Sequence, residues 1–165
     1  MCKPNSGSVP SSPTLRHYTS KILKLLSFNV ENLEPKLDEP QFINLINQHD
    51  ICIFCETWKK DVSKLDLPGF WDFSQIRPKT KKIGRHSGGI TVLVKKNIRK
   101  GVKIEHDTEG FLWVKLDKCF FSFPNHVFLC GAYIPPVRSR NSVGHIDFLE
   151  NYQSKSVNFP IEEMC

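Results

Sequence analysis

Short apolar runs alternate along the chain with polar segments rich in glycine and proline, a pattern that predicts strands joined by turns. Residues 21–30 and 50–57 are the first two predicted strands, and the second is apolar at successive positions. The segment 34–50 between them places Phe42, Leu45 and Ile46 at helical spacing. A strand, a helix and a strand in this order predict a βαβ unit whose strands are parallel.

The remaining segments predict more strands and one more helix. Strands are expected within 66–79, 84–97 and 126–136, an antiparallel pair around a turn is expected within 102–117, and a helix is expected at 142–156. Within 84–97, Ile90, Val92 and Val94 alternate with Thr91 and Leu93. The order predicts an α/β layered sandwich at 21–157, after a disordered tail at 1–20 and before an irregular end at 158–165.

Length and cysteine content narrow the class of protein. A chain of 165 residues suits one domain with its own core. We find no apolar stretch of roughly 18 residues and no signal peptide, so we expect an intracellular protein without a membrane segment. The six cysteines are then expected to be free thiols with no disulfide partner. Cys52 and Cys55 form a C-x-x-C inside a predicted strand, where their side chains point to opposite faces and are unsuited to one zinc ion.

The charge of the chain is unevenly distributed. The net charge is +6, and residues 77–103 contain ten basic residues and no acidic one. A solvated face is the ordinary explanation of such a run, but the absence of interspersed acids favours contact with the phosphate backbone of a nucleic acid. The candidate nucleic-acid-binding residues are Arg77, Lys79, Lys81, Lys82, Arg85, Lys95 and Lys96.

Polar residues stand at the ends of several predicted strands. Asn29, Glu56 and Tyr133 each end an apolar run, and Ser87–Gly89 open another where the backbone can be approached closely. A turn asparagine, a solvated glutamate and a core-edge tyrosine are the ordinary alternatives. Carboxylate and amide oxygens also suit Mg²⁺ or Mn²⁺, and a phenol can donate to a phosphate oxygen. Sheet enzymes build sites at such strand ends.

Four stretches resemble, in order, the first motifs of the endonuclease/exonuclease/phosphatase superfamily: LLSFNVENL, IFCETW, HSGGITVLVKK and GAYIPP. They are most similar to the apurinic-type endonuclease domains of non-LTR retrotransposons, over about Leu23 to Tyr152. The resemblance implies a deoxyribonuclease I-like layered α/β sandwich. It also implies Mg²⁺-assisted attack of water on a DNA phosphodiester, releasing 3′-OH and 5′-phosphate ends. DNA nicking would place the protein in the nucleus.

The resemblance also implies roles for individual residues. Asn29, Glu56 and Tyr133 take the catalytic positions, and Glu56 and Asn29 take those of the metal ligands. Glu31 stands where apurinic endonucleases have an aspartate near the metal. Its side chain is one methylene longer, so Glu31 is a secondary candidate.

The sequence departs from the family in one important respect. The Gly-Asp-x-Asn motif that positions the attacking water and the Ser-Asp-His motif that stabilises the developing charge do not occur. The resemblance therefore implies a truncated domain whose second half is missing, with weak metal binding, little or no activity and an exposed apolar face. A non-catalytic nucleic-acid-binding remnant is the alternative. A second alternative is a phosphoinositide or sphingolipid phosphodiesterase. The basic residues in the middle of the chain make this alternative less favourable.

Overall fold

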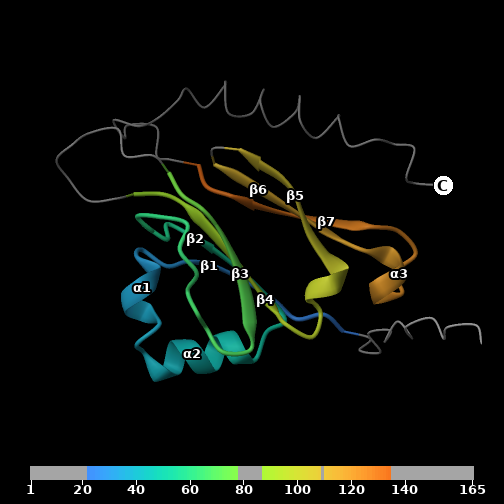
Figure 1. The fold of residues 1–165 in the computed structure, drawn as a ribbon, viewed down its shortest axis with the longest axis horizontal. Coiled ribbons are helices and arrows are strands. Elements are labelled where there is room, and N and C mark those ends of the chain that lie inside the picture. Colours follow the sequence, from blue (N-terminus) through green and yellow to red (C-terminus); the bar gives the residue numbers. More distant parts are fainter. Residues whose placement is uncertain (1–21, 78–86, 109, 135–165) are drawn as a thin grey trace, which may run out of the picture.

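A computed structural model describes residues 22–77, 87–108 and 110–134, which form a mixed α/β arrangement of two sheets and a few short helices (Figure 1). The tail predicted at 1–20, the helix predicted at 142–156 and the irregular end predicted at 158–165 lie outside the described residues. Within the described ranges, no helix is long and apolar enough to cross a membrane.

The first sheet contains the predicted βαβ unit. Its strands lie in the order β1-β2-β4-β3. They are β1 (Leu25–Asn29), β2 (Ile51–Cys55), β3 (Phe70–Gln75) and β4 (Ile90–Lys95). The parallel pairing of β1 with β2 places Asn29 opposite Cys55. Between them, α1 (Leu33–Lys36) is followed by α2 (Pro40–Asn47), whose first residue is a proline, the position where a missing N–H is harmless. The predicted parallel pair is confirmed.

The second sheet is antiparallel, in the order β5-β6-β7. Its strands are β5 (Val102–Thr108), β6 (Phe111–Leu116) and β7 (Val127–Ala132), accompanied by the short helices η1 (Arg99–Gly101) and α3 (Lys118–Phe121). The predicted hairpin within 102–117 is confirmed. The prediction that the last strand is buried is largely wrong: Gly131 is the one buried residue of β7, because β7 is an edge strand among the described residues.

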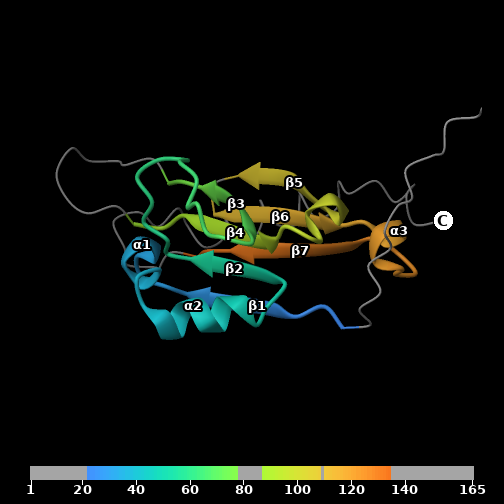
Figure 2. The ribbon, with the colours of Figure 1, turned by 60° about the horizontal axis from the view of Figure 1, so that its bottom comes forward.

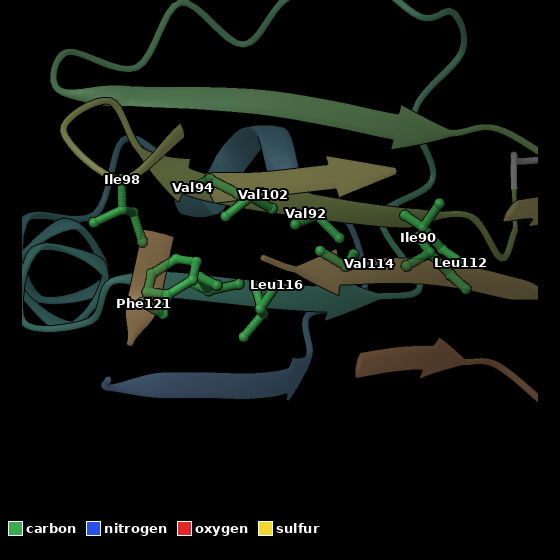
Figure 3. Close-up of a cluster of buried hydrophobic side chains, with 10 residues drawn as sticks. Ile90, Val92, Val94, Ile98, Val102, Leu112, Val114, Leu116 and Phe121 are labelled. Carbon is green, nitrogen blue, oxygen red and sulfur yellow. The ribbon is translucent and has the colours of Figure 1, made fainter. Parts of the chain in front are cut away.

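Apolar side chains from the facing sides of the two sheets form the main core. Every second residue of β4 points into it, and so does every second residue of β6 (Figure 3). These residues are Ile90, Val92 and Val94 on β4, and Leu112, Val114 and Leu116 on β6. The alternation predicted in β4 is thereby confirmed. At Gly131 the sheets approach so closely that a Cβ atom would lie 2.7 Å from Cγ2 of Ile53.

A second core lies on the other face of the first sheet, under α1 and α2. Cys52 and Phe54 of β2 pack there with Phe42 and Ile46 of α2. Cys55, by contrast, packs against the core between the sheets. The prediction that the two cysteines of the C-x-x-C point to opposite faces is therefore confirmed, and β2 is covered on both sides as its apolar sequence predicted.

Three strands bring their carboxyl ends to the same side of the molecule. β1, β2 and β7 point in one direction, as their arrowheads show in Figure 2. β7 also contacts β2 across the interface between the sheets. The residues that follow these strands, which include Glu56 and Tyr133, therefore meet at one edge of the sandwich, where Asn29 ends β1.

Candidate active site at the strand ends

The chain after β1 and the chain after β2 continue side by side beyond the sheet. The amide of Val30 donates to the carbonyl of Cys55 at 3.0 Å, and the amide of Asn32 donates to the carbonyl of Glu56 at 2.9 Å. The ladder ends with the amide of Leu33, 3.1 Å from the carbonyl of Thr57. These bonds hold the end of β1, with Asn29, beside the turn that carries Glu56.

That turn has an unusual backbone. Glu56 and Trp58 adopt left-handed φ angles of 57° and 53°, a conformation that is costly for residues with a side chain. The glycines that face them, Gly88 and Gly89, have φ angles of 74° and 86°. The amide of Trp58 donates to the carbonyl of Gly88 at 3.0 Å, which ties the two turns together. Strained backbone of this kind concentrates at functional sites.

The Glu56 carboxylate is surrounded by hydrogen-bond donors. Its Oε2 atom accepts from the amide of Gly88 at 2.7 Å and from the indole Nε1–H of Trp58 at 2.6 Å. The hydroxyl of Tyr133 is a third donor to this carboxylate. A half-buried carboxylate needs such compensation, and these donors fix its orientation.

Tyr133 lies against the same glycine from the second sheet. Burial, followed by its hydrogen bond to Glu56 and the charge of Glu56, raises the pKa of Tyr133 to about 12, although the charge of Arg77 acts in the opposite direction. A Cβ atom on Gly88 would lie 2.9 Å from Cδ of Arg77 and 3.6 Å from Cε1 of Tyr133. Arg77 and Tyr133 therefore flank the peptide that donates to Glu56.

Two further residues complete the surroundings of Glu56. Thr57 is fully buried, and its Oγ1 has no hydrogen-bond partner among the described residues. A Cβ atom on Gly89 would lie 2.8 Å from this oxygen. On the other side, Sγ of Cys55 lies 3.6 Å from the carbonyl of Ala132, and burial together with the neighbouring Glu56 charge raises the pKa of that thiol. The thiol of Cys55 is therefore protonated at neutral pH.

The basic residues predicted to bind nucleic acid do not share one place. Arg77 lies at the site, whereas Lys79, Lys81, Lys82 and Arg85 lie outside the described residues. Lys95 ends β4 at the opposite end of the first sheet, where its ammonium pairs with Asp50 at 3.1 Å. Lys96 is exposed beside it. Within the described ranges, Lys95 and Lys96 therefore lie the length of β4 away from Arg77.

The donor set suits a small, hard cation. Glu56 supplies a carboxylate, and the register of β1 with β2 places Asn29 next to the strand that ends in this glutamate. Glu31 is exposed in the turn after β1. Among the described residues, no group of three or more histidine, cysteine, aspartate or glutamate side chains is arranged to hold a metal. One carboxylate and one amide fit Mg²⁺, which keeps several of its waters and also binds substrate phosphates.

Sequence reasoning missed one of the three donors that hold Glu56, the indole of Trp58. Ser87–Gly89 were singled out for close backbone approach, and the structure confirms that close approach at Gly88 and Gly89. Trp58 was not singled out, because side chains two residues apart in an extended chain share a face without touching. Its contact with Glu56 depends on two left-handed residues that no local pattern predicts.

Comparison with known proteins does not assign the chain to a family. No protein-family model matches the chain. No curated protein matches it significantly in sequence either.

Proposed function

We propose that the strand-end cluster around Glu56 is part of a metal-dependent phosphodiesterase site of the deoxyribonuclease I-like kind, with DNA as substrate. The observation that carries the proposal is the meeting of Glu56, the Gly88 amide, Tyr133 and Arg77, which arrive from both sheets. A carboxylate beside a phenol and a guanidinium is a combination that phosphoryl chemistry uses. The described residues form a mixed α/β arrangement of two sheets, which is compatible with a general α/β class.

Each residue has a part in the proposed chemistry. Glu56 and Asn29 would hold Mg²⁺ or Mn²⁺, which supplies Lewis-acid stabilisation of charge on a phosphoryl oxygen. Tyr133, whose raised pKa keeps its hydroxyl protonated at neutral pH, would redirect its single O–H from Glu56 to a phosphate oxygen. Arg77 offsets the negative charge of the same phosphate. Since the sequence contains neither Gly-Asp-x-Asn nor Ser-Asp-His, we expect these residues alone to turn over slowly or not at all.

A nucleic-acid-binding module without catalysis is the second candidate. The run of ten basic residues without an acid at 77–103 favours it. Its binding would be dominated by phosphate contacts and would weaken steeply as salt is raised. Both candidates would contact the phosphate backbone of DNA, and the nicking function would place the protein in the nucleus.

Nicking of supercoiled plasmid by the full chain separates the two candidates. Nicking by the proposed phosphodiesterase would need Mg²⁺ or Mn²⁺ and would fall by at least about 100-fold in Glu56→Gln. Glu34→Gln is the matched control, because Glu34 is an exposed glutamate on α1 outside the cluster. Binding of the same plasmid is measured at several salt concentrations.

Each outcome favours one candidate. Metal-dependent nicking that is lost in Glu56→Gln and kept in Glu34→Gln supports the phosphodiesterase. Salt-sensitive DNA binding without nicking, unchanged by Glu56→Gln, supports the binding module. Absence of both DNA binding and Mn²⁺ binding would remove both candidates.

A further inference from the structure

The most unusual contact of the cluster joins Trp58 to Glu56. The indole Nε1 lies 2.6 Å from Oε2 of a carboxylate only two residues earlier in the chain. The contact depends on the left-handed φ angles of both residues. Left-handed backbone is costly for residues with a side chain, so the surrounding structure must hold this turn in place. The carbonyl of Gly88 does so by accepting from the Trp58 amide.

A half-buried indole N–H usually finds some acceptor, so a purely structural role is the ordinary explanation. Here the acceptor is a charged carboxylate that already accepts from the Gly88 amide on the same oxygen. Each carboxylate oxygen has two lone pairs, and both lone pairs of Oε2 are thereby engaged. Oε1 then keeps capacity for a cation, because the Tyr133 hydroxyl, the third donor to this carboxylate, uses at most one of its two lone pairs.

This division of the two oxygens has a consequence for metal choice. Ca²⁺ commonly takes a carboxylate through both oxygens, whereas Mg²⁺ is bound in a compact octahedron through single oxygens and keeps several waters. A carboxylate whose Oε2 is saturated by two donors is poorly suited to bidentate binding. Partners that orient a ligand in this way typically change metal affinity 10–100-fold.

We propose that Trp58 is a positioning residue, whose indole N–H keeps Oε2 of Glu56 occupied so that the site takes Mg²⁺ or Mn²⁺ through Oε1 and disfavours Ca²⁺. The proposal deepens the function proposed above and rests on it, since it assumes that Glu56 binds a divalent cation. It assigns a role to a residue that sequence reasoning passed over.

Calorimetric titration of the full chain with MnCl₂, MgCl₂ and CaCl₂ tests the proposal. We expect Trp58→Phe to weaken Mn²⁺ binding by about 10-fold and to lower the preference for Mn²⁺ over Ca²⁺ by a similar factor. Trp71→Phe is the matched control, because Trp71 lies on β3 in contact with Arg99 and away from Glu56. Indole fluorescence gives a second signal: Mn²⁺ should quench a saturable component that is absent in Trp58→Phe.

The outcomes distinguish this inference from the proposed function. If wild type binds Mn²⁺ through Glu56 but Trp58→Phe leaves both affinity and preference unchanged, the role of Trp58 is overturned and the metal site stands. If wild type and Glu56→Gln both fail to bind Mn²⁺, both proposals fall.

A second variant covers the case in which Trp58→Phe does not fold. Benzothienylalanine has the shape of tryptophan but carries sulfur in place of the N–H. Incorporated at position 58 in a chain with Trp71→Phe and Trp113→Phe, it removes only the donor. The same loss of Mn²⁺ affinity supports the proposal, and unchanged affinity overturns it.

Discussion

At the scale of single residues, the cluster depends on the hydrogen bonds that the Glu56 carboxylate accepts, one of them from Tyr133. The carboxylate accepts three donors, and one of them is the phenol. The arrangement stabilises the neutral form of Tyr133.

The ionisation of Tyr133 tests this arrangement directly. Its pKa of about 12 in the folded protein lies above the ordinary value of about 10. The stabilisation that results is fully present below pH 10 and is lost as the pH rises through 12. A chain with Tyr18→Phe and Tyr152→Phe leaves Tyr133 as its single tyrosine, so absorbance near 295 nm follows that residue alone.

We expect a midpoint near pH 12 while circular dichroism still reports the native fold. Glu56→Gln in the same background should move the midpoint toward 10, because it removes the negative charge that opposes ionisation. A midpoint near 10 in the folded chain with Glu56 intact would contradict the contact.

At the scale of elements, the site depends on how closely β7 approaches β2. Gly131 is the buried residue of β7, and it faces Ile53 and Ile90 of the first sheet. The absence of a side chain there lets the backbone of β7 lie against the first sheet. The separation of the sheets at this point fixes how far Tyr133, two residues later, lies from Glu56.

Gly131→Ala tests that close approach. The new Cβ would lie 2.7 Å from Cγ2 of Ile53 and 3.1 Å from Cγ2 of Ile90, so the sheets must move apart. We expect a loss of about 1–3 kcal/mol in the free energy of unfolding, measured by urea denaturation. Ala132→Ser is the control, because Ala132 is exposed on the same strand. If Gly131→Ala were as stable as wild type, the interface between the two sheets would have space for a methyl group at this position.

At the scale of the whole molecule, two hydrophobic cores lie on the two faces of the first sheet. Cys52 belongs to the core under the helices, and Cys55 packs against the core between the sheets. The apolar face for which the sequence predicted exposure is covered, in the described part of the chain, by the second sheet. Exposed apolar side chains remain along the edge strand β1, at Leu25 and Phe28.

Thiol reactivity reports how often the core under the helices opens. Burial raises the pKa of Cys52 to about 12, so its thiol is both inaccessible and protonated in the native protein, whereas Cys119 is exposed on α3. We expect iodoacetamide at pH 8 to modify Cys119 at least about 100-fold faster than Cys52. Peptide mass spectrometry after timed pulses measures both rates. Comparable rates would mean that the core under the helices opens often enough to expose Cys52.

Hydrophobic periodicity by itself determined the strands, the βαβ unit and the hairpin. Each of these elements is encoded by residues that are neighbours in the chain, such as Ile90, Val92 and Val94. The same local patterns placed Asn29, Glu56 and Tyr133 at strand ends. They misjudged β7, because whether a strand is central or at an edge depends on partners that are distant in sequence.

Tertiary structure alone decided how those strand ends are arranged. The hydrogen bond from the Gly88 amide to Glu56 joins residues 32 positions apart. The hydrogen bond from Trp58 to Glu56 lies in a turn in which both residues have left-handed φ angles, which the packed structure stabilises. Likewise, Lys95 belongs to one basic run with Arg77 in the sequence, but the length of β4 and the ion pair with Asp50 separate it from the site. Local patterns determine which elements form, whereas the burial of their faces against one another determines which side chains meet.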